Sequence, residues 1–294
     1  MDTLAAIGRE IAAARGIACA PLPAARLTGG SNSCYRWDAA AGAMFVKVGP
    51  RESHAAFAAE AAGLAALCAA RALRVPRVLA CAHTDTAAFL ALEWIEAARA
   101  SVACERRLGE GLAALHAVTA PRFGWERDNT IGRTLQLNGW TDGWAEFFRE
   151  RRLRPQLELA ARNGFGTLLT ARGERLLESL PALLSDHVVT ASLLHGDLWG
   201  GNWLAANSGE PVIFDPAVYY GDREADLSLT RLFGGFSAAF YRAYEALAPL
   251  PPGATARSEL YNLYHVLNHA NLFGGGYAQQ ARASIERLLA EVGG

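Results

Sequence analysis

The chain has 294 residues, of which 51% are hydrophobic and 19% are charged. This composition can form a large apolar core, which excludes an intrinsically disordered protein. The 28 basic and 29 acidic residues give a formal net charge of −1, so the molecule as a whole has no electrostatic attraction to nucleic acid or to an acidic membrane. We therefore expect a folded protein that binds no nucleic acid and no membrane.

The N-terminal segment MDTLAAIGREIAAARG mixes charged and apolar residues, which predicts an amphipathic helix and not a signal peptide. A later Ala-rich run at residues 55–70 carries Glu60 at its centre, so we do not expect it to span a membrane. The five cysteines include no CxxC pair, which favours reduced thiols. Reduced thiols are typical of the cytoplasm, and we expect that location.

The first third of the chain predicts a small β-rich lobe. A helix over residues 1–15 is followed by short strands near 26–28, 34–37 and 44–48. A second helix is expected over 53–70, and two more strands near 77–82 and 88–94. One helix among about five strands forms a compact lobe that ends near residues 95–100.

Helices dominate the rest of the chain. They are expected near residues 103–118, 143–162, 168–185, 225–247 in pieces, and 257 to the end. Residues 193–216 are the exception, because they predict two short strands joined by a turn at Asn207, Ser208 and Gly209. The fold class is therefore α+β, with an N-terminal nucleotide-binding lobe over 1–96 and a larger, mainly helical lobe over 97–294.

Three oxygen-bearing side chains lie in or beside this predicted hairpin. Asp197 and Asn202 are in the loop before it, and Asp215 follows its second strand. Asp and Asn oxygens are suitable ligands for Mg²⁺, and a further carboxylate can accept the proton of a hydroxyl group. Each of these residues taken alone is explained as well by a turn cap. Their combination favours a phosphoryl-transfer site.

Such a site needs a lysine for the phosphates and a carboxylate to orient it. The strand FVKV contains Lys47 among apolar residues, and Glu60 lies thirteen residues later in the Ala-rich helix. Upstream, the turn formed by Gly29, Gly30, Ser31 and Asn32 can present backbone N–H groups to phosphates. The backbone of Glu93, Trp94 and Ile95, near the end of the first lobe, can bond to an adenine edge.

The motifs GGSNSCYRW, FVKV, FLALEWIE, LLHGDLWGGNWL and VIFDPAVYYGDREADL resemble the fructosamine kinase family, which has a protein-kinase-like fold. The resemblance extends over nearly the whole chain. It implies that Asp197 is the catalytic base, that Asn202 and Asp215 bind Mg²⁺, and that Glu60 positions Lys47 on the phosphates of ATP. His195 is expected to support the loop. Asp222 occupies a position where the family usually has His.

The resemblance also implies the reaction. We expect an ATP-dependent kinase that phosphorylates a sugar hydroxyl, O3, of a small or protein-bound ketosamine, so that the product decomposes and frees the amine. Candidate substrate contacts are Trp199, Asp128, Asn129 and Gln136. Cys34, beside the phosphate-covering turn, is either exposed to nucleotide or buried in its strand. The alternatives are a kinase of an aminoglycoside or choline, and a His/Asp metal-dependent hydrolase using His195, Asp197 and Asp215.

Overall fold

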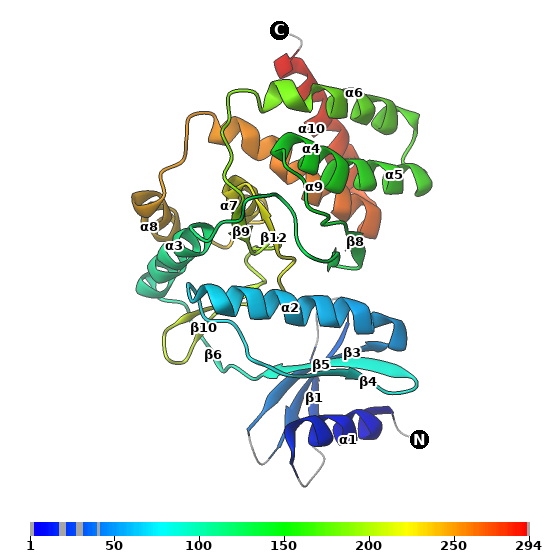
Figure 1. The fold of residues 1–294 in the computed structure, drawn as a ribbon, viewed down its shortest axis with the longest axis vertical. Helices are drawn as coiled ribbons and strands as arrows, with labels where there is room; N and C mark the ends of the chain where they lie inside the picture. Colours follow the sequence, from blue (N-terminus) through cyan, green and yellow to red (C-terminus); the bar gives the residue numbers. More distant parts are fainter. Residues whose placement is uncertain (1–2, 18–21, 28–31, 40–41, 293–294) are drawn as a thin grey trace. The chain divides into compact units, whose positions relative to one another are not determined.

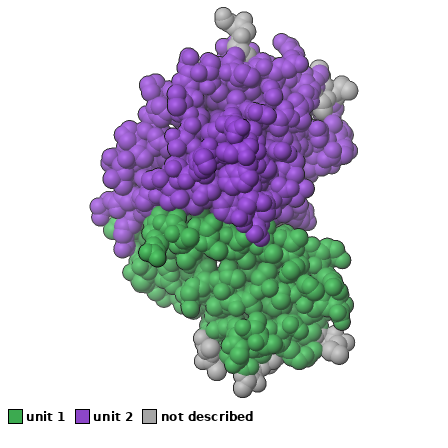
Figure 2. Space-filling view, viewed as in Figure 1, with its two compact units in different colours: residues 1–104, 203–216 green, residues 105–202, 217–294 purple. Residues whose placement is uncertain are grey.

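A computed structural model describes residues 3–17, 22–27, 32–39 and 42–292. The chain forms two compact units, which Figure 2 distinguishes by colour. Unit 1 comprises Met1–Cys104 and Trp203–Pro216, and unit 2 comprises Glu105–Asn202 and Ala217–Gly294. The predicted division at residue 96 therefore differs from these units in two respects: the first unit extends to Cys104, and residues 203–216 also belong to it.

Unit 1 is built on an antiparallel sheet of five strands in the order β1-β2-β3-β5-β4. The helix α1 (Thr3–Arg15) covers one face and α2 (His54–Ala70) covers the other, as Figure 1 shows. The prediction of about five strands with one helix packed among them is correct for this sheet and α2. The strands are β1 (Leu22–Leu27), β2 (Ser33–Asp38), β3 (Met44–Pro50), β4 (Val78–His83) and β5 (Ala87–Glu93).

The alternation of side chains along β3 decides which face each residue occupies. Met44 and Val46 are fully buried with Ile7 and Ile11 of α1. Lys47 therefore points to the opposite face, toward α2. On α2, Glu60 lies one turn from buried Phe57 and from buried Leu64, so it shares their inward face.

A two-stranded hairpin explains why residues 203–216 belong to unit 1. Its strands β10 (Trp203–Ala206) and β11 (Pro211–Ile213) are joined by the predicted turn, in which Gly209 has φ +81°. Strand β10 pairs with β6 (Ala97–Ala98), and the N–H of Ile213 donates to the carbonyl of Arg74 at 3.0 Å. These backbone bonds attach the hairpin to residues of the first hundred.

Among the described residues, the stretch Arg51–Ala70 has the length and apolar composition of a membrane span. Its Glu60 is bonded to Lys47 of the sheet, which identifies α2 as a packed helix of unit 1.

Unit 2 is mainly helical, and its core is formed by aromatic and leucine side chains such as Phe147, Leu176 and Leu267. Two short antiparallel strand pairs lie among its helices. A five-residue π-helical segment, Arg149–Leu153, connects α4 to α5. Apart from this segment and the β10–β11 hairpin, the elements after β6 are, in chain order, α3 (Val102–His116), β7 (Asn129–Ile131), β8 (Thr134–Gln136), α4 (Trp144–Phe148), α5 (Arg154–Arg162), α6 (Thr167–Leu183), β9 (Ser192–Leu194), β12 (Tyr219–Gly221), α7 (Arg223–Leu232), α8 (Ala238–Leu247), α9 (Ala254–Phe273) and α10 (Gly276–Val292).

The helix α9 contains a titratable side chain that is buried in the core of unit 2. His265 is 5% exposed, and its burial, reinforced by the nearby charge of His269, lowers the pKa of its imidazole to about 3. An unfolded histidine titrates near pH 6.5. The folded state therefore resists a proton that the unfolded state accepts, so stability is complete above about pH 6.5 and falls as the pH drops below it.

We predict that His265→Phe makes the protein less sensitive to acid. Between pH 7.5 and pH 5 the wild type should lose about 2 kcal/mol more unfolding free energy than the variant, because only the wild type has this proton to take up on unfolding. Chemical denaturation at the two pH values measures the difference, with His83→Gln at an exposed position as control. Equal losses in wild type and variant would contradict the prediction.

Candidate active site

The side chain of Lys47 is held between two carboxylates of unit 1. Its Nζ donates to Oε1 of Glu60 at 2.8 Å and to Oδ1 of Asp215 at 2.5 Å. The lysine is only 5% exposed. Three separate stretches of sequence therefore meet at one ammonium: strand β3, helix α2 and the residues that follow β11. The contact expected between Lys47 and Glu60 is present.

Charge and burial act against each other in this cluster. Burial alone would lower the pKa of Lys47, but the attraction of Glu60 and Asp215 raises it, so the ammonium remains charged. Burial also raises the pKa of the Glu60 carboxyl, in opposition to the attraction of Lys47. Lys47 therefore keeps its charge, while the pKa of the Glu60 carboxyl is raised to about 7.

Asp215 has an unusual backbone as well as a charged contact. Its φ of 57° lies in the left-handed region, which costs energy for a residue other than glycine. Its side chain is 40% exposed, in contrast to the buried lysine it contacts. The strained backbone and the hairpin β10–β11 together direct this carboxylate toward Lys47 while leaving part of it accessible.

Unit 1 also contains a cavity of about 370 Å³ that ends at Asp215. Its wall is mostly apolar and includes Phe45, Leu92, Leu204 and Phe214, with the backbone of residues 93–97 along one side. An apolar cavity with a few polar groups at its edge suits an aromatic base. The cavity therefore lies where the sequence predicted adenine to bind.

The three residues predicted to contact adenine do not contribute equally. All three line the cavity, but the N–H of Glu93 donates to the carbonyl of Arg77 at 2.9 Å and that of Trp94 to Ala43 at 3.4 Å. The Glu93 carboxylate bonds to Arg74 and Arg77. Because those two N–H groups serve the chain itself, a ligand would find its backbone donors at Ile95 and beyond.

The predicted phosphate-covering turn is only partly described. Gly29, Gly30 and Ser31 lie outside the described residues, and Asn32 immediately precedes β2. Within β2, Cys34 is directly opposite Lys47, so the two side chains share a face of the sheet. Cys34 is 7% exposed, and burial raises the pKa of its thiol despite the nearby lysine. The structure thus favours a buried Cys34.

The loop after β9 carries the candidate base of unit 2. The amide of Asn202 donates to the backbone carbonyl of Asp197 at 2.8 Å and to its Oδ2 at 3.1 Å. Asn202 is buried and Asp197 is half-buried. One amide therefore holds both the backbone and the carboxylate of Asp197, which fixes the direction in which this carboxylate points.

The buried carboxylate of Asp226, which the sequence analysis did not assign to the site, is bonded to the backbone of the same loop. Oδ2 of Asp226 accepts the N–H of His195 at 2.7 Å, and Oδ1 accepts that of Gly196 at 2.8 Å. Its Oδ2 also bonds to Nε2 of His116 at 3.2 Å. These hydrogen bonds outweigh the effect of burial and lower the pKa of Asp226, so it stays ionised.

His195 acts through its position in this loop. It is fully buried, its N–H bonds to Asp226, and its Nδ1 accepts the N–H of Asp197 at 3.3 Å. Gly196 has φ +81°, and a Cβ there would come within 2.0 Å of the Ala217 carbonyl oxygen. Only glycine fits, so the His-Gly-Asp order is a requirement of the loop backbone. The expected supporting role of His195 agrees with these contacts.

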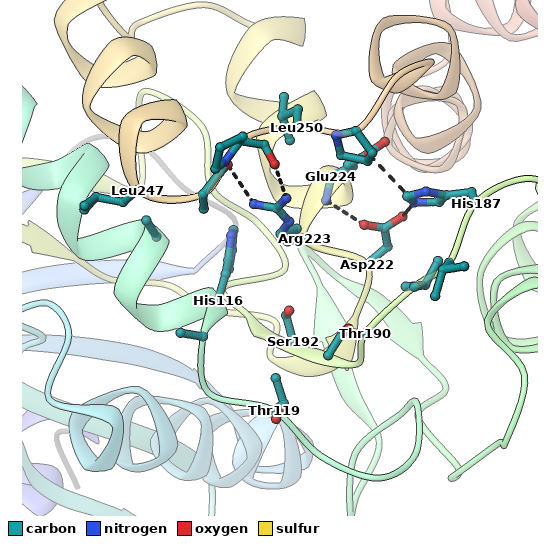
Figure 3. Close-up of a pocket in the computed structure, with 17 residues that line it drawn as sticks. His116, Thr119, His187, Thr190, Ser192, Asp222, Arg223, Glu224, Leu247 and Leu250 are labelled. Carbon is teal, nitrogen blue, oxygen red and sulfur yellow. Dashed lines mark hydrogen bonds and ion pairs between the residues drawn. The ribbon is translucent and has the colours of Figure 1, made fainter.

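A second cavity, of about 710 Å³, lies in unit 2, and its wall includes His116 of α3 and Ser192 of β9. Figure 3 shows His187, Asp222 and Glu224 gathered on its wall, with their polar atoms facing one another. In the described part of the chain these three form the one group of His, Cys, Asp and Glu able to hold a metal. His195, Asp197 and Asp215, the residues of the predicted hydrolase alternative, are not among them.

Internal contacts already occupy the cavity cluster. Asp222 caps α7 by accepting the N–H of Glu224 at 2.9 Å, and its other oxygen bonds to His187 and to Tyr261, each at 2.5 Å. Glu224 forms two hydrogen bonds with Arg257. Asp222 therefore has a structural role, as the cap that starts α7.

Two of the predicted substrate contacts are part of the core of unit 2. Gln136 is 1% exposed; its amide donates to Asn129 and to the Ala217 carbonyl, and its oxygen accepts the Tyr264 hydroxyl. Asn129 is 5% exposed and donates to the Val218 carbonyl. Because their polar groups bond inside the unit, we assign both to its packing and not to substrate.

The other two predicted substrate contacts lie at the surface of unit 2. The Asp128 carboxylate accepts the N–H of Asn138 at 2.7 Å, which closes the loop around the β7–β8 hairpin. Trp199 is 41% exposed and lies two residues after Asp197. Of the four, Trp199 is the one whose exposure and position suit contact with a substrate.

Known proteins resemble this chain over most of its length. The family profile described as fructosamine kinase matches residues 3–291. A "Probable ketoamine kinase" of Synechocystis sp. is 48% identical over 83% of this chain and 82% of its own length. The chloroplastic protein-ribulosamine 3-kinase of Oryza sativa subsp. indica is 40% identical over 88% of this chain and 75% of its own length.

Solved structures agree with the sequence relatives. The crystal structure of a predicted fructosamine-3-kinase from Haemophilus somnus superimposes with a TM-score of 0.89 at 28% identity, covering 96% of each chain. An aminoglycoside phosphotransferase solved with ADP and hygromycin B superimposes with a TM-score of 0.61 at 14% identity, covering 98% of this chain and 99% of its own, which shows a shared fold. The predicted protein-kinase-like α+β fold is confirmed. The chain belongs to the fructosamine kinase family.

Proposed function

We propose that the protein is an ATP-dependent kinase that transfers the terminal phosphoryl group of ATP to a sugar hydroxyl of ketosamines. The acceptors are fructosamine or ribulosamine adducts of small amines or of protein lysines, and the hydroxyl is O3. The observation that carries this proposal is the charged, buried Lys47 held by Glu60 and by Asp215, which also lines an apolar cavity. Names of the relatives, ketoamine kinase and protein-ribulosamine 3-kinase, support the acceptor class.

Each part of the cluster has a task in this reaction. The cavity of unit 1 receives the adenine, and the Lys47 ammonium neutralises charge on the phosphates. Glu60 keeps the lysine extended. Because phosphoryl transfer passes through a loose transition state, most of the acceleration comes from alignment and from fixed charges. A lysine that is buried, charged and held on two sides meets that requirement.

Asp197 aligns the acceptor. Its carboxylate receives the proton of the sugar hydroxyl while the hydroxyl oxygen forms a bond to the terminal phosphorus. The bond from that phosphorus to the bridging oxygen breaks, and ADP leaves with the electron pair. The Asn202 amide bonded to Oδ2 of Asp197 supports this role, because it restrains the carboxylate before the acceptor arrives.

The residues present fit a magnesium ion. Asp215 offers a partly exposed carboxylate beside the Lys47 ammonium. Asn202 supplies an amide oxygen, since its nitrogen donates to Asp197. Hard oxygen donors of this kind are those that Mg²⁺ prefers. The ion would neutralise phosphate charge alongside Lys47, and we assign its ligands to Asp215 and Asn202.

The phosphorylated ketosamine is expected to decompose and to release the free amine, which makes the reaction a protein deglycation. The competing acceptors are aminoglycosides and choline, which are substrates for a kinase of the same fold.

We predict ATP-dependent ADP release with fructosyl-lysine or ribulosyl-lysine and none above background with an aminoglycoside or choline. A coupled ADP assay run on the four acceptors side by side measures this. Turnover of the aminoglycoside alone would replace the proposed acceptor.

The role of Asp197 is tested by Asp197→Asn. The variant keeps the size of the side chain but cannot accept a proton, so we predict a fall in kcat of about 10²- to 10⁴-fold with little change in nucleotide affinity. Steady-state kinetics and a fluorescent nucleotide titration measure the two effects. Asp142→Asn, which changes an exposed aspartate of unit 2, is the matched control. Undiminished turnover in Asp197→Asn would remove Asp197 from the base role.

Cys34 reports on nucleotide binding because it shares a sheet face with Lys47. We predict that an alkylating reagent labels Cys34 much more slowly than exposed Cys68, since burial and a raised pKa keep its thiolate scarce. Adding Mg-ATP should slow Cys34 further and leave Cys68 unaffected. Mass spectrometry of the labelled peptides follows both. If nucleotide gives Cys34 no protection, this thiol is not part of the nucleotide site.

A further inference from the structure

Five rings of unit 2 form a connected set that we call the aromatic row: Trp199, Phe233, His269, Phe273 and Tyr277. Trp199 contacts Phe233, Phe233 contacts His269, and His269 contacts both Phe273 and Tyr277. The Trp199 and Phe233 rings are 6.3 Å apart at 73°, and Phe233 is 4.7 Å from His269. His269 lies 5.5 Å from Phe273 and 5.2 Å from Tyr277. The residues come from the loop after β9, the end of α7, and helices α9 and α10.

Much of this row is open to solvent. Trp199 is 41% exposed, Phe233 38% and Phe273 66%. Large aromatic side chains stabilise a fold mainly by being buried, so a connected set of exposed rings indicates a binding surface more than a packing requirement.

Glycines at two points give Trp199 a defined position. A Cβ on Gly201 would come within 2.3 Å of the Trp199 ring, so the ring lies against the bare backbone of that residue. Gly200 packs on Gly235, where a Cβ would come within 2.9 Å of the Gly200 Cα. The segments WGGN and FGG are thereby pressed together, which brings Trp199 beside Phe233.

The row begins at the candidate base. Trp199 is two residues after Asp197, so their Cα atoms are at most about 7.6 Å apart. The same Asn202 that holds the Asp197 side chain also donates its backbone N–H to the Trp199 carbonyl at 2.9 Å. A group bound on Trp199 is therefore close to the hydroxyl that Asp197 aligns.

In a ketosamine, the amine nitrogen and the O3 hydroxyl are about as far apart as a group on Trp199 and a hydroxyl aligned by Asp197. Its nitrogen is attached to C1 of the sugar, two carbons from the O3 hydroxyl, and it is an alkylated amine that is protonated at neutral pH. A cation is attracted to the face of an aromatic ring, most strongly to tryptophan, and two rings meeting at a steep angle surround it on two sides. Beyond the nitrogen, the alkyl chain of a modified lysine needs an apolar path.

We propose that the corner between Trp199 and Phe233 binds the secondary ammonium of the ketosamine, and that His269, Phe273 and Tyr277 carry the alkyl chain beyond it. This inference rests on the proposed function and specifies how that site tells a ketosamine from a neutral sugar. Trp199 and Phe233 are then specificity-determining residues, while Asp197 performs the same chemistry on any acceptor it can align.

A matched pair of acceptors tests the proposal. N-butyl fructosamine and 1-O-butyl fructose differ only in an ammonium against an ether oxygen at the same place. We expect wild type to prefer the N-linked acceptor in kcat/KM by about 3- to 30-fold, the range of a cation–π contact. Trp199→Leu and Phe233→Leu should each bring the ratio closer to one, through KM for the N-linked acceptor, while kcat stays within a few-fold. Trp199→Phe should retain most of the preference.

The variants separate the rings from other sources of preference. Attraction between the ammonium and Asp197 would also favour the N-linked acceptor, but it would survive in Trp199→Leu and Phe233→Leu. Trp140→Leu is the matched control, since Trp140 is 38% exposed and stacks on Tyr220 instead. Melting temperatures and nucleotide affinity confirm that each variant is folded.

The outcomes are distinct. Equal use of the two acceptors by wild type, or a preference unchanged in both leucine variants, overturns the proposal while the kinase function stands. Phosphorylation of neither acceptor by wild type overturns the proposed function and this inference with it. If Trp199→Leu does not fold, Phe233→Leu and the wild-type comparison still decide the matter.

Discussion

The buried ammonium of Lys47 is the interaction on which unit 1 depends. Taking a charge out of water is costly, and it is tolerated here because Glu60 and Asp215 approach from two sides. Each partner belongs to a different element, so the cluster joins β3, α2 and the β10–β11 hairpin. This explains why residues 203–216 are part of unit 1 although they are far from it in sequence. The groups proposed to act on phosphate are therefore also structural supports.

Unit 2 uses one buried carboxylate in a comparable way. Asp226 fastens the backbone of His195 and Gly196, and Asn202 then holds Asp197 above them. The base is thus restrained through its own backbone, which is stiffer than restraint through a side chain alone. Asp226 lies on α7 and is itself bonded to His116 on α3. These two helices of unit 2 therefore set the position of the loop. Rigid elements of this kind provide the alignment that phosphoryl transfer requires.

The sequence predicted contacts that have a local signature. The pairing of Lys47 with Glu60 was predicted from their kinase-like order and separation along the chain, whereas the burial of Lys47 appears only in the structure. Asp226 and His116 are 110 residues apart and their spacing carries no pattern, so their contact appears only in the structure. Arg152 lies in an arginine-rich stretch of the sequence, yet it is fully buried, with its guanidinium over the rings of Tyr219 and Phe147. An arginine satisfied by aromatic faces and carbonyls leaves no charge pair to find in a sequence.

The segment HGDLWGGN combines two kinds of information that a sequence cannot separate. Gly196 is needed because its backbone passes close to Ala217, and Gly201 because the Trp199 ring covers it. Between them lie the proposed base and the exposed ring. Although Trp199 faces solvent, its ring lies against Gly201, where the ring leaves no space for a Cβ. The backbone that orients Asp197 therefore also orients Trp199, so one loop positions both the proposed base and the proposed acceptor contact.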